Sequence, residues 1–167
     1  MRKVLPLLLC ATLASSALAR GTIVYAGGSW AAIDRGTTCE ALARSVRIAA
    51  KGKVQATAGF TFSPDRRRWG EFHALLRRMP RPGAAVMLRV DSQPFLLISR
   101  GNWAWSSGPV QEQAIIAALR GATGMSIESR DAAGQRFADP YSLEGAATAI
   151  DAAAAACAGK KAVIALR

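Results

Sequence analysis

The chain has little of the chemistry that most enzyme active sites use. Its 167 residues include one histidine, three cysteines and eleven acidic residues, against 22 lysines and arginines. A serine or cysteine nucleophile needs a histidine within hydrogen-bond reach, and His73 is the only candidate. We expect His73 to be exposed and solvated instead, because in a strand it shares a face with Glu71. No catalytic residue is therefore predicted.

Metal and cofactor sites lack their usual signatures as well. The cysteines have no CxxC spacing, and a single histidine cannot complete four zinc ligands. Gly27-Gly28 and the segment 121–124 (Gly-Ala-Thr-Gly) lack the glycine spacing and the lysine of a phosphate loop. The acidic residues are scattered, although an envelope hydrolase that uses two of them as a carboxylate pair stays open as an alternative. We expect no metal, no cofactor and no enzymatic activity.

No apolar run is long enough to cross a membrane, so no transmembrane segment is predicted. The first 19 residues instead match a secretory signal peptide. Arg2 and Lys3 supply the positive charge, residues 4–13 the apolar stretch, and residues 17–19 (Ala-Leu-Ala) a small-residue cleavage site. We expect residues 1–19 to be removed and residues 20–167 to form a single β-rich domain that is periplasmic or secreted.

Cysteine content then sets a redox prediction. Cleavage removes Cys10 and leaves Cys39 and Cys157. In an oxidising compartment an isolated pair predicts one disulfide bond. The alternative is two separate buried thiols, because free cysteine is among the most buried residue types.

The excess of positive charge lies in the first half of the mature chain. Residues 20–100 carry 14 lysines and arginines and five acids, whereas residues 101–167 carry six of each sign. A one-sided basic surface attracts polyanions; behind a signal peptide these are lipopolysaccharide, anionic lipid headgroups or acidic glycans before nucleic acid. The alternative is a solvated basic face without a ligand. The candidate anion-binding residues are the densest arginines of this half: Arg66, Arg67, Arg68, Arg77, Arg78 and Arg81.

Alternation of apolar with polar or small residues predicts strands through the first hundred residues. The clearest alternation spans residues 54–62, and the other predicted strands span 30–33, 37–42, 69–77, 84–90 and 95–98. Trp103 and Trp105 share one face of a further short strand. Tryptophan beside arginine can stack on sugars or bases, but in a sheet it more often belongs to the core.

Two helices are predicted in the second half. The first follows Pro109, which suits a first helical position, and carries an apolar stripe that includes Ile115 and Leu119. A strand over 125–130 and a turn over 131–134 come next. The second helix is expected to begin around Ser142, a good N-cap residue, and to end with Cys157 facing inward. The predicted fold is mainly β, on the border of α+β: an antiparallel β-sandwich-like domain with two helices, one of them C-terminal.

Two segments carry a family resemblance. The segment WAAIDRGTTCEAL places Trp30 nine residues before Cys39, and GQRFADPYSLEGAATAIDAAAAAC closes the described pattern. The second segment resembles the terminal helix motif of the invasion-associated locus B family of exported proteobacterial proteins. The matching residues are Ser142, Leu143, Gly145 and Ala149. Over most of residues 29–157 the chain resembles a divergent member of that family. The resemblance implies a β-rich exported domain in the cell envelope, with an envelope- or host-interaction role and no catalytic residues.

We therefore expect a non-enzymatic exported envelope protein of this type that acts as a binding or interaction module. Its expected partner is an anionic envelope polymer or another envelope or host protein, and not nucleic acid. A polyanion-binding protein that uses the basic half is the main alternative. A purely structural envelope factor without a ligand is a further one.

Overall fold

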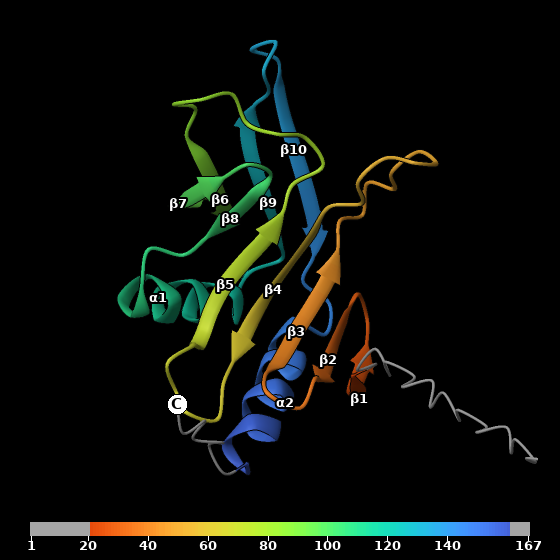
Figure 1. The fold of residues 1–167 in the computed structure, drawn as a ribbon, viewed down its shortest axis with the longest axis vertical. Helices are drawn as coiled ribbons and strands as arrows, with labels where there is room; N and C mark the ends of the chain where they lie inside the picture. Colours follow the sequence, from red (N-terminus) through yellow and green to blue (C-terminus); the bar gives the residue numbers. More distant parts are fainter. Residues whose placement is uncertain (1–20, 161–167) are drawn as a thin grey trace, which may run out of the picture.

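The computed structural model describes residues 21–160, so the predicted signal peptide lies outside the described residues. Ten strands form one sheet in which every neighbouring pair is antiparallel, in the order β1-β2-β3-β4-β5-β8-β7-β6-β9-β10 (Figure 1). The strands are β1 (Thr22–Gly27), β2 (Trp30–Asp34), β3 (Cys39–Arg44), β4 (Thr57–Phe62), β5 (Trp69–Leu75), β6 (Val86–Val90), β7 (Gln93–Arg100), β8 (Trp103–Trp105), β9 (Gly124–Arg130) and β10 (Arg136–Ser142). The predicted mainly-β class with two helices is confirmed.

One face of this sheet is apolar because side chains alternate along each strand. Phe60, Phe72 and Ala74 are buried on this inner face, and the core continues through Leu88 and Ile127 in the second half of the sheet. Their cross-strand partners are also buried: Phe60 lies opposite Phe72, and Leu88 lies opposite Ile127. The opposite, outer face carries charged side chains such as Arg89, Glu128 and Arg136, together with exposed apolar ones such as Leu96 and Ile98.

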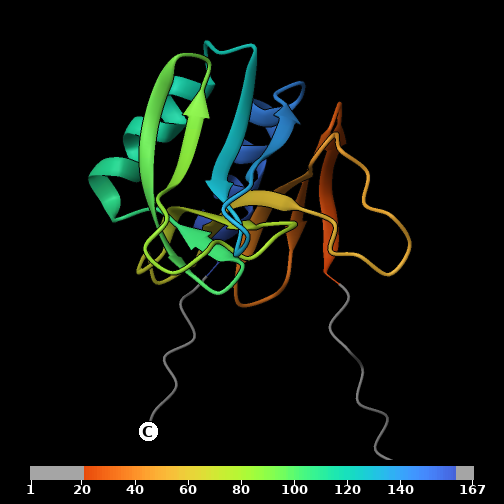
Figure 2. The same ribbon diagram turned by 90° about the horizontal axis from the view of Figure 1, so that it is seen from above.

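The helices cover different parts of the inner face. Helix α1 (Pro109–Leu119) packs mainly on β5, and α2 (Ala146–Ala158) packs mainly on β2 and β3. In both views β1 and β2 lie on the opposite side of the molecule from α1 (Figures 1 and 2). No helix within the described residues is long and apolar enough to cross a membrane.

The start of α2 differs from the prediction. Ser142 is the last residue of β10, and Gly145 is the residue that precedes the first helical turn. Gly145 has a φ of 84°, which favours glycine, and a Cβ at this position would lie 2.1 Å from the carbonyl oxygen of Gly27. The close approach of the β1–β2 turn therefore fixes where the helix begins, and an N-cap signal alone could not reveal it.

A disulfide bond joins Cys39 on β3 to Cys157 on α2, with the two Cα atoms 5.7 Å apart. This separation lies within the range that a disulfide requires. The bond fastens the last helix to the sheet across 118 residues of sequence.

Candidate functional site

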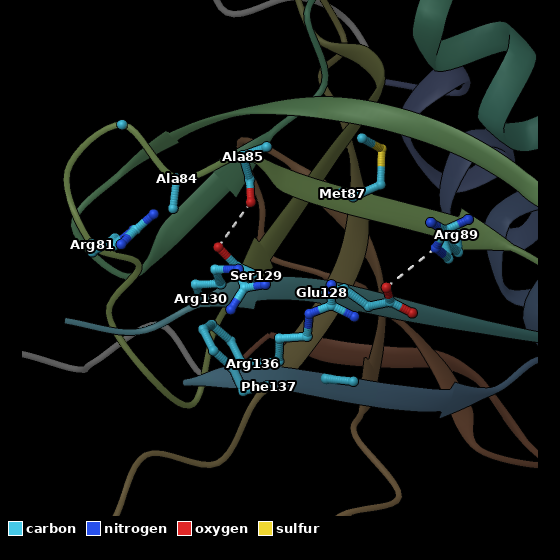
Figure 3. A pocket seen from close by; sticks show the side chains of 12 residues that line it. Arg81, Ala84, Ala85, Met87, Arg89, Glu128, Ser129, Arg130, Arg136 and Phe137 are labelled. Atoms are coloured by element: carbon cyan, nitrogen blue, oxygen red, sulfur yellow. Dashed lines mark hydrogen bonds and ion pairs between the residues drawn. The ribbon is translucent and has the colours of Figure 1, made fainter. Parts of the chain in front are cut away.

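The outer face of β6, β9 and β10 forms an arginine-lined depression, here called the outer-face hollow. Its volume is about 640 Å³. Figure 3 shows the side chains that line it. The antiparallel register brings its side chains together, because Arg130 lies opposite Arg136 and Met87 lies opposite Glu128. Residues two apart on a strand share a face, which places Arg89 beside Met87. The hollow is lined by Arg81, Gly83, Ala84, Ala85, Met87, Arg89, Glu128, Ser129, Arg130, Arg136, Phe137 and Ala138.

Positive charge dominates the outer-face hollow. It holds four arginines and one glutamate, which gives a net charge of +3. Glu128 pairs with Arg89 at 3.2 Å, and the Arg130 guanidinium donates to the carbonyl oxygen of Gly134. Within residues 21–160, no carboxylate lies within 4.0 Å of the Arg81, Arg130 or Arg136 guanidinium. These three guanidinium groups are therefore available to an anionic ligand.

A second basic depression lies between the β3–β4 loop and the segment after β5. This loop hollow has a volume of about 400 Å³, and its charged lining residues are Arg47, Lys53, Arg77 and Arg78. The segment 77–81 runs from the loop hollow to the outer-face hollow. There the Arg81 backbone NH donates to the Arg130 carbonyl oxygen, and Arg78 pairs with Asp131 at 2.8 Å. The two hollows and the segment between them are here called the extended basic surface, in which Arg77 and Arg78 pair with Asp139 and Asp131.

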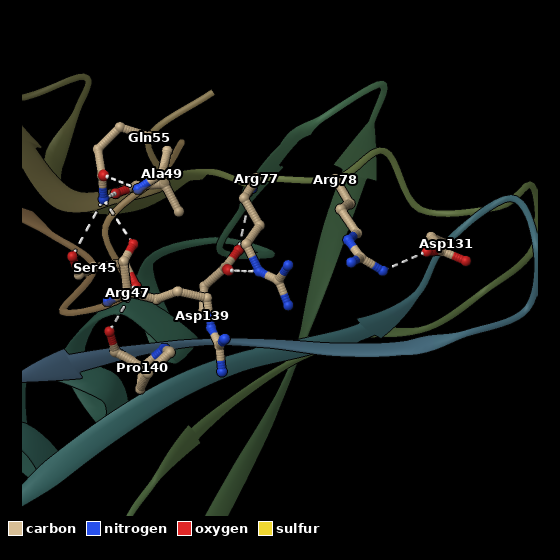
Figure 4. A network of polar contacts seen from close by, with 10 residues as sticks. Ser45, Arg47, Ala49, Gln55, Arg77, Arg78, Asp131, Asp139 and Pro140 are labelled. Atoms are coloured by element: carbon tan, nitrogen blue, oxygen red, sulfur yellow. Dashed lines mark hydrogen bonds and ion pairs between the residues drawn. The ribbon is translucent and has the colours of Figure 1, made fainter. Parts of the chain in front are cut away.

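A buried ion pair anchors this surface to the core (Figure 4). Asp139, fully buried on β10, lies 2.7 Å from Nε of Arg77 and accepts a hydrogen bond from the Arg77 backbone NH. Next to it, the Ser45 hydroxyl and the Val46 backbone NH both donate to the Pro140 carbonyl oxygen. The last strand of the sheet is thereby joined to the segment after β3. Burial raises the pKa of Asp139 above its usual range, although the Arg77 guanidinium opposes this shift.

The six arginines that the sequence predicts as anion-binding residues fall into two separate groups in the structure. Arg66, Arg67 and Arg68 precede β5, whereas Arg77, Arg78 and Arg81 follow it. A strand of seven residues is about 20 Å long, so the groups lie at opposite ends of β5. Only the second group borders the two hollows.

The three arginines of the first group contact side chains that lie close to them in the sequence. Arg68 makes a two-bond contact with the Glu71 carboxylate, and Arg67 lies 3.6 Å from Asp65. The Arg66 guanidinium lies 4.1 Å from the ring centre of Trp69, a cation–π distance. These contacts leave less charge available to a ligand than the outer-face hollow offers.

The search for stretches rich in arginine missed Arg89, Arg130 and Arg136 because these residues are far apart in the chain. The second half sums to zero charge, which hides two arginines that a hairpin places side by side. A usable signal was present in the predicted turn over 131–134. An antiparallel hairpin around that turn pairs Arg130 with Arg136.

The prediction of an exposed His73 is wrong. His73 is buried, its Nδ1 lies 3.2 Å from the Thr61 hydroxyl, and its ring lies 6.4 Å from the ring of Trp103. The tryptophans of β8 cover the outer face at this point and exclude water. Burial lowers the pKa of His73, and this effect outweighs the nearby carboxylates of Glu40 and Glu71.

Glu112 and Asp139 are the two acids whose pKa values are raised, and neither of them lines one of the two hollows. Burial raises the pKa of Glu112 on α1, whose carboxylate accepts a hydrogen bond from the Ser106 hydroxyl. Within the described part of the chain, no three histidine, cysteine or acidic side chains lie close enough together to hold a metal ion.

Comparison of the chain with known proteins found no matching family model, no matching curated protein and no matching solved structure.

Proposed function

We propose that this protein is a non-enzymatic, exported envelope protein of the invasion-associated locus B type that binds an anionic envelope polymer through its extended basic surface. The observation that carries the proposal is the outer-face hollow, where three guanidinium groups have no carboxylate partner among the described residues. Arginine suits this task because its planar guanidinium binds phosphate and carboxylate groups through two parallel hydrogen bonds.

The geometry of the hollow also supports a polymer over a small ion. The segment 77–81 links the outer-face hollow to the loop hollow, where Arg47 and Lys53 add positive charge to that of the outer-face hollow. A chain of phosphate or carboxylate groups can contact several of them at once. Multiple contacts on one polymer add avidity that a single ion does not gain.

A soluble polyphosphate is a suitable probe, because it carries negative charge without an apolar part. We expect the double variant Arg130→Gln/Arg136→Gln to bind it about tenfold or more weakly than the wild type, since charge-assisted hydrogen bonds are lost. Raising the salt should weaken wild-type binding steeply, because the screening length falls from about 10 Å at 0.1 M to about 3 Å at 1 M.

The matched control is Arg66→Gln/Arg67→Gln, which removes the same amount of charge at the other end of β5. This variant should bind polyphosphate almost as tightly as the wild type in isothermal titration calorimetry. Equal losses in the two double variants would show that net charge alone, rather than the outer-face hollow, determines binding. A polyphosphate affinity that changes neither with the salt concentration nor with the arginine substitutions would rule the proposal out.

A further inference from the structure

An apolar strip lies on the outer face beside the outer-face hollow. Its members are Leu96 and Ile98 on β7 and Trp103 and Trp105 on β8. Leu96 and Ile98 are 57% and 58% exposed, and Trp103 is 40% exposed. The two indole rings lie 6.3 Å apart and nearly parallel, and Ile98 lies directly opposite Trp105. Contiguous apolar side chains in water mark a contact surface.

The strip and the hollow are neighbours in the register of the sheet. Leu96 lies opposite Met87 on β6, and Met87 lies opposite Glu128 on β9. Met87 is itself part of the lining of the hollow. Residues directly opposite each other on paired strands share a face, so the apolar strip and the guanidinium groups of the hollow face the same side of the molecule.

Cations flank the apolar strip on more than one side. Arg100 on β7 lies directly opposite Trp103, and no carboxylate of the described residues lies within 4.0 Å of it. Arg89, at the opposite end of the same face, contacts Glu128. An anionic surface that also offers apolar groups complements this arrangement in charge and in hydrophobicity.

We infer that the strip docks on the surface of an anionic lipid membrane, with the apolar side chains between the headgroups and the arginines on the lipid phosphates. Tryptophan favours the membrane–water interface, where its ring is half apolar and half polar. Arginine extends along an apolar surface and keeps its charged end at the phosphate level. This inference rests on the proposed function, since both use the arginines of the outer-face hollow.

The exposed aliphatic side chains favour lipid over an acidic glycan as the occupant. A sugar ring stacks on aromatic rings and needs hydrogen-bond partners around them. Leu96 and Ile98 supply neither, yet they are more exposed than Trp103. Acyl chains and glycerol backbones are the groups that gain from contact with leucine and isoleucine.

The test compares vesicles of phosphatidylglycerol with vesicles of phosphatidylcholine, using flotation and tryptophan fluorescence. The wild type should bind the anionic vesicles, and its emission should shift to shorter wavelength as Trp103 leaves water. The variant Leu96→Ser/Ile98→Ser should bind them about tenfold or more weakly, because buried aliphatic area is lost. Its binding to soluble polyphosphate should stay at the wild-type level.

Two further variants make the result specific. Val110→Ser removes a side chain that is 85% exposed on α1, and it should leave vesicle binding unchanged. Trp103→Phe should keep most of the binding and lose most of the fluorescence shift. Arg130→Gln/Arg136→Gln should weaken binding to vesicles and to polyphosphate alike.

The outcomes separate this inference from the proposed function. Wild-type vesicle binding by Leu96→Ser/Ile98→Ser would overturn the inference, because the contact would then be electrostatic only. A parallel loss of polyphosphate binding in that variant would also overturn it, since the strip would then support the polymer site itself. Vesicle binding without polyphosphate binding would contradict the proposed function and leave the lipid contact standing.

Discussion

Among the described residues, Asp139 and Arg77 form the most buried ion pair. The Asp139 carboxylate is fully buried, and the Arg77 side chain is 21% exposed. Removing one partner of a buried pair leaves an uncompensated charge. We therefore expect Asp139→Ala to lower the free energy of unfolding by about 3 kcal/mol in urea denaturation.

Arg78 offers a control in the same segment. Its partner is Asp131, in a contact nearer the surface, and exposed ion pairs contribute little to stability. Arg78→Ala should therefore cause a much smaller loss than Asp139→Ala. Equal losses would mean that the pair with Asp139 contributes no more than a surface contact.

His73 makes stability depend on pH near neutrality. Burial lowers its pKa below the ordinary value of 6.5, so the unfolded chain binds a proton more readily than the folded one. Its contribution to stability is complete above about pH 6.5 and is lost as the pH falls through the lowered pKa. We expect the wild type to lose stability as the pH falls below the ordinary histidine pKa of about 6.5.

The matched variant is His73→Gln, which keeps a polar side chain and removes the titration. Its free energy of unfolding should change less over the same pH range, measured by urea denaturation at each pH. The chain has a single histidine, so no other imidazole confuses the comparison. An identical pH dependence in both proteins would show that His73 does not titrate as its burial requires.

At the level of elements, periodicity predicted most of what the structure contains. The alternation in 54–62 and 69–77 corresponds to β4 and β5, and the stripe after Pro109 to α1. Each of these elements has one buried face, and a regular spacing of apolar residues along the sequence indicates such a face. Strand β1 was missed because its side chains are mostly exposed or half-buried, so it has little apolar alternation to read.

Gly145 shows why the start of α2 could not be predicted locally. Its constraint comes from the carbonyl oxygen of Gly27, a residue far away in the chain. Gly145→Ala should therefore destabilise the protein by more than the strain of about 1–3 kcal/mol that a left-handed backbone alone causes. The control is Gly36→Ala, with a similar φ of 85° and no heavy atom within 4 Å of the added Cβ. Equal melting temperatures for the two variants would contradict the role of the close approach.

The disulfide links two elements that are distant in sequence, β3 and α2. Closing a loop of 118 residues reduces the entropy of the unfolded chain, which corresponds to about 4–5 kcal/mol in the usual treatment. The variant Cys39→Ala/Cys157→Ala should therefore melt at a markedly lower temperature in calorimetry. Thiol titration of the oxidised protein prepared without residues 1–19 should find no free thiol. Two titratable thiols, or an unchanged melting temperature, would contradict a stabilising bond.

At the level of the whole molecule, the sequence predicted that the protein is basic and only part of where its positive charge lies. The arginine-rich stretches include Arg66–Arg68, which contact nearby residues, and also Arg77, Arg78 and Arg81, which border the two hollows. Strand pairing instead brings Arg89, Arg130 and Arg136 together from three strands. The pairing of Arg130 with Arg136 follows from the local hairpin around residues 131–134. The place of Arg89 in the same hollow depends on the pairing of β6 with β9, which are far apart in the sequence and which no local pattern brings together.

Nuclear magnetic resonance tests most directly whether the outer-face hollow binds the anionic polymer. The measurement follows backbone amide and arginine Nε–Hε signals while soluble polyphosphate is added to the protein prepared without residues 1–19. We predict the largest shifts at Arg81, Arg130 and Arg136, with little change at Arg66, Arg67 and Arg68. Shifts concentrated at Arg66–Arg68, or spread evenly over all the arginines, would contradict the claim.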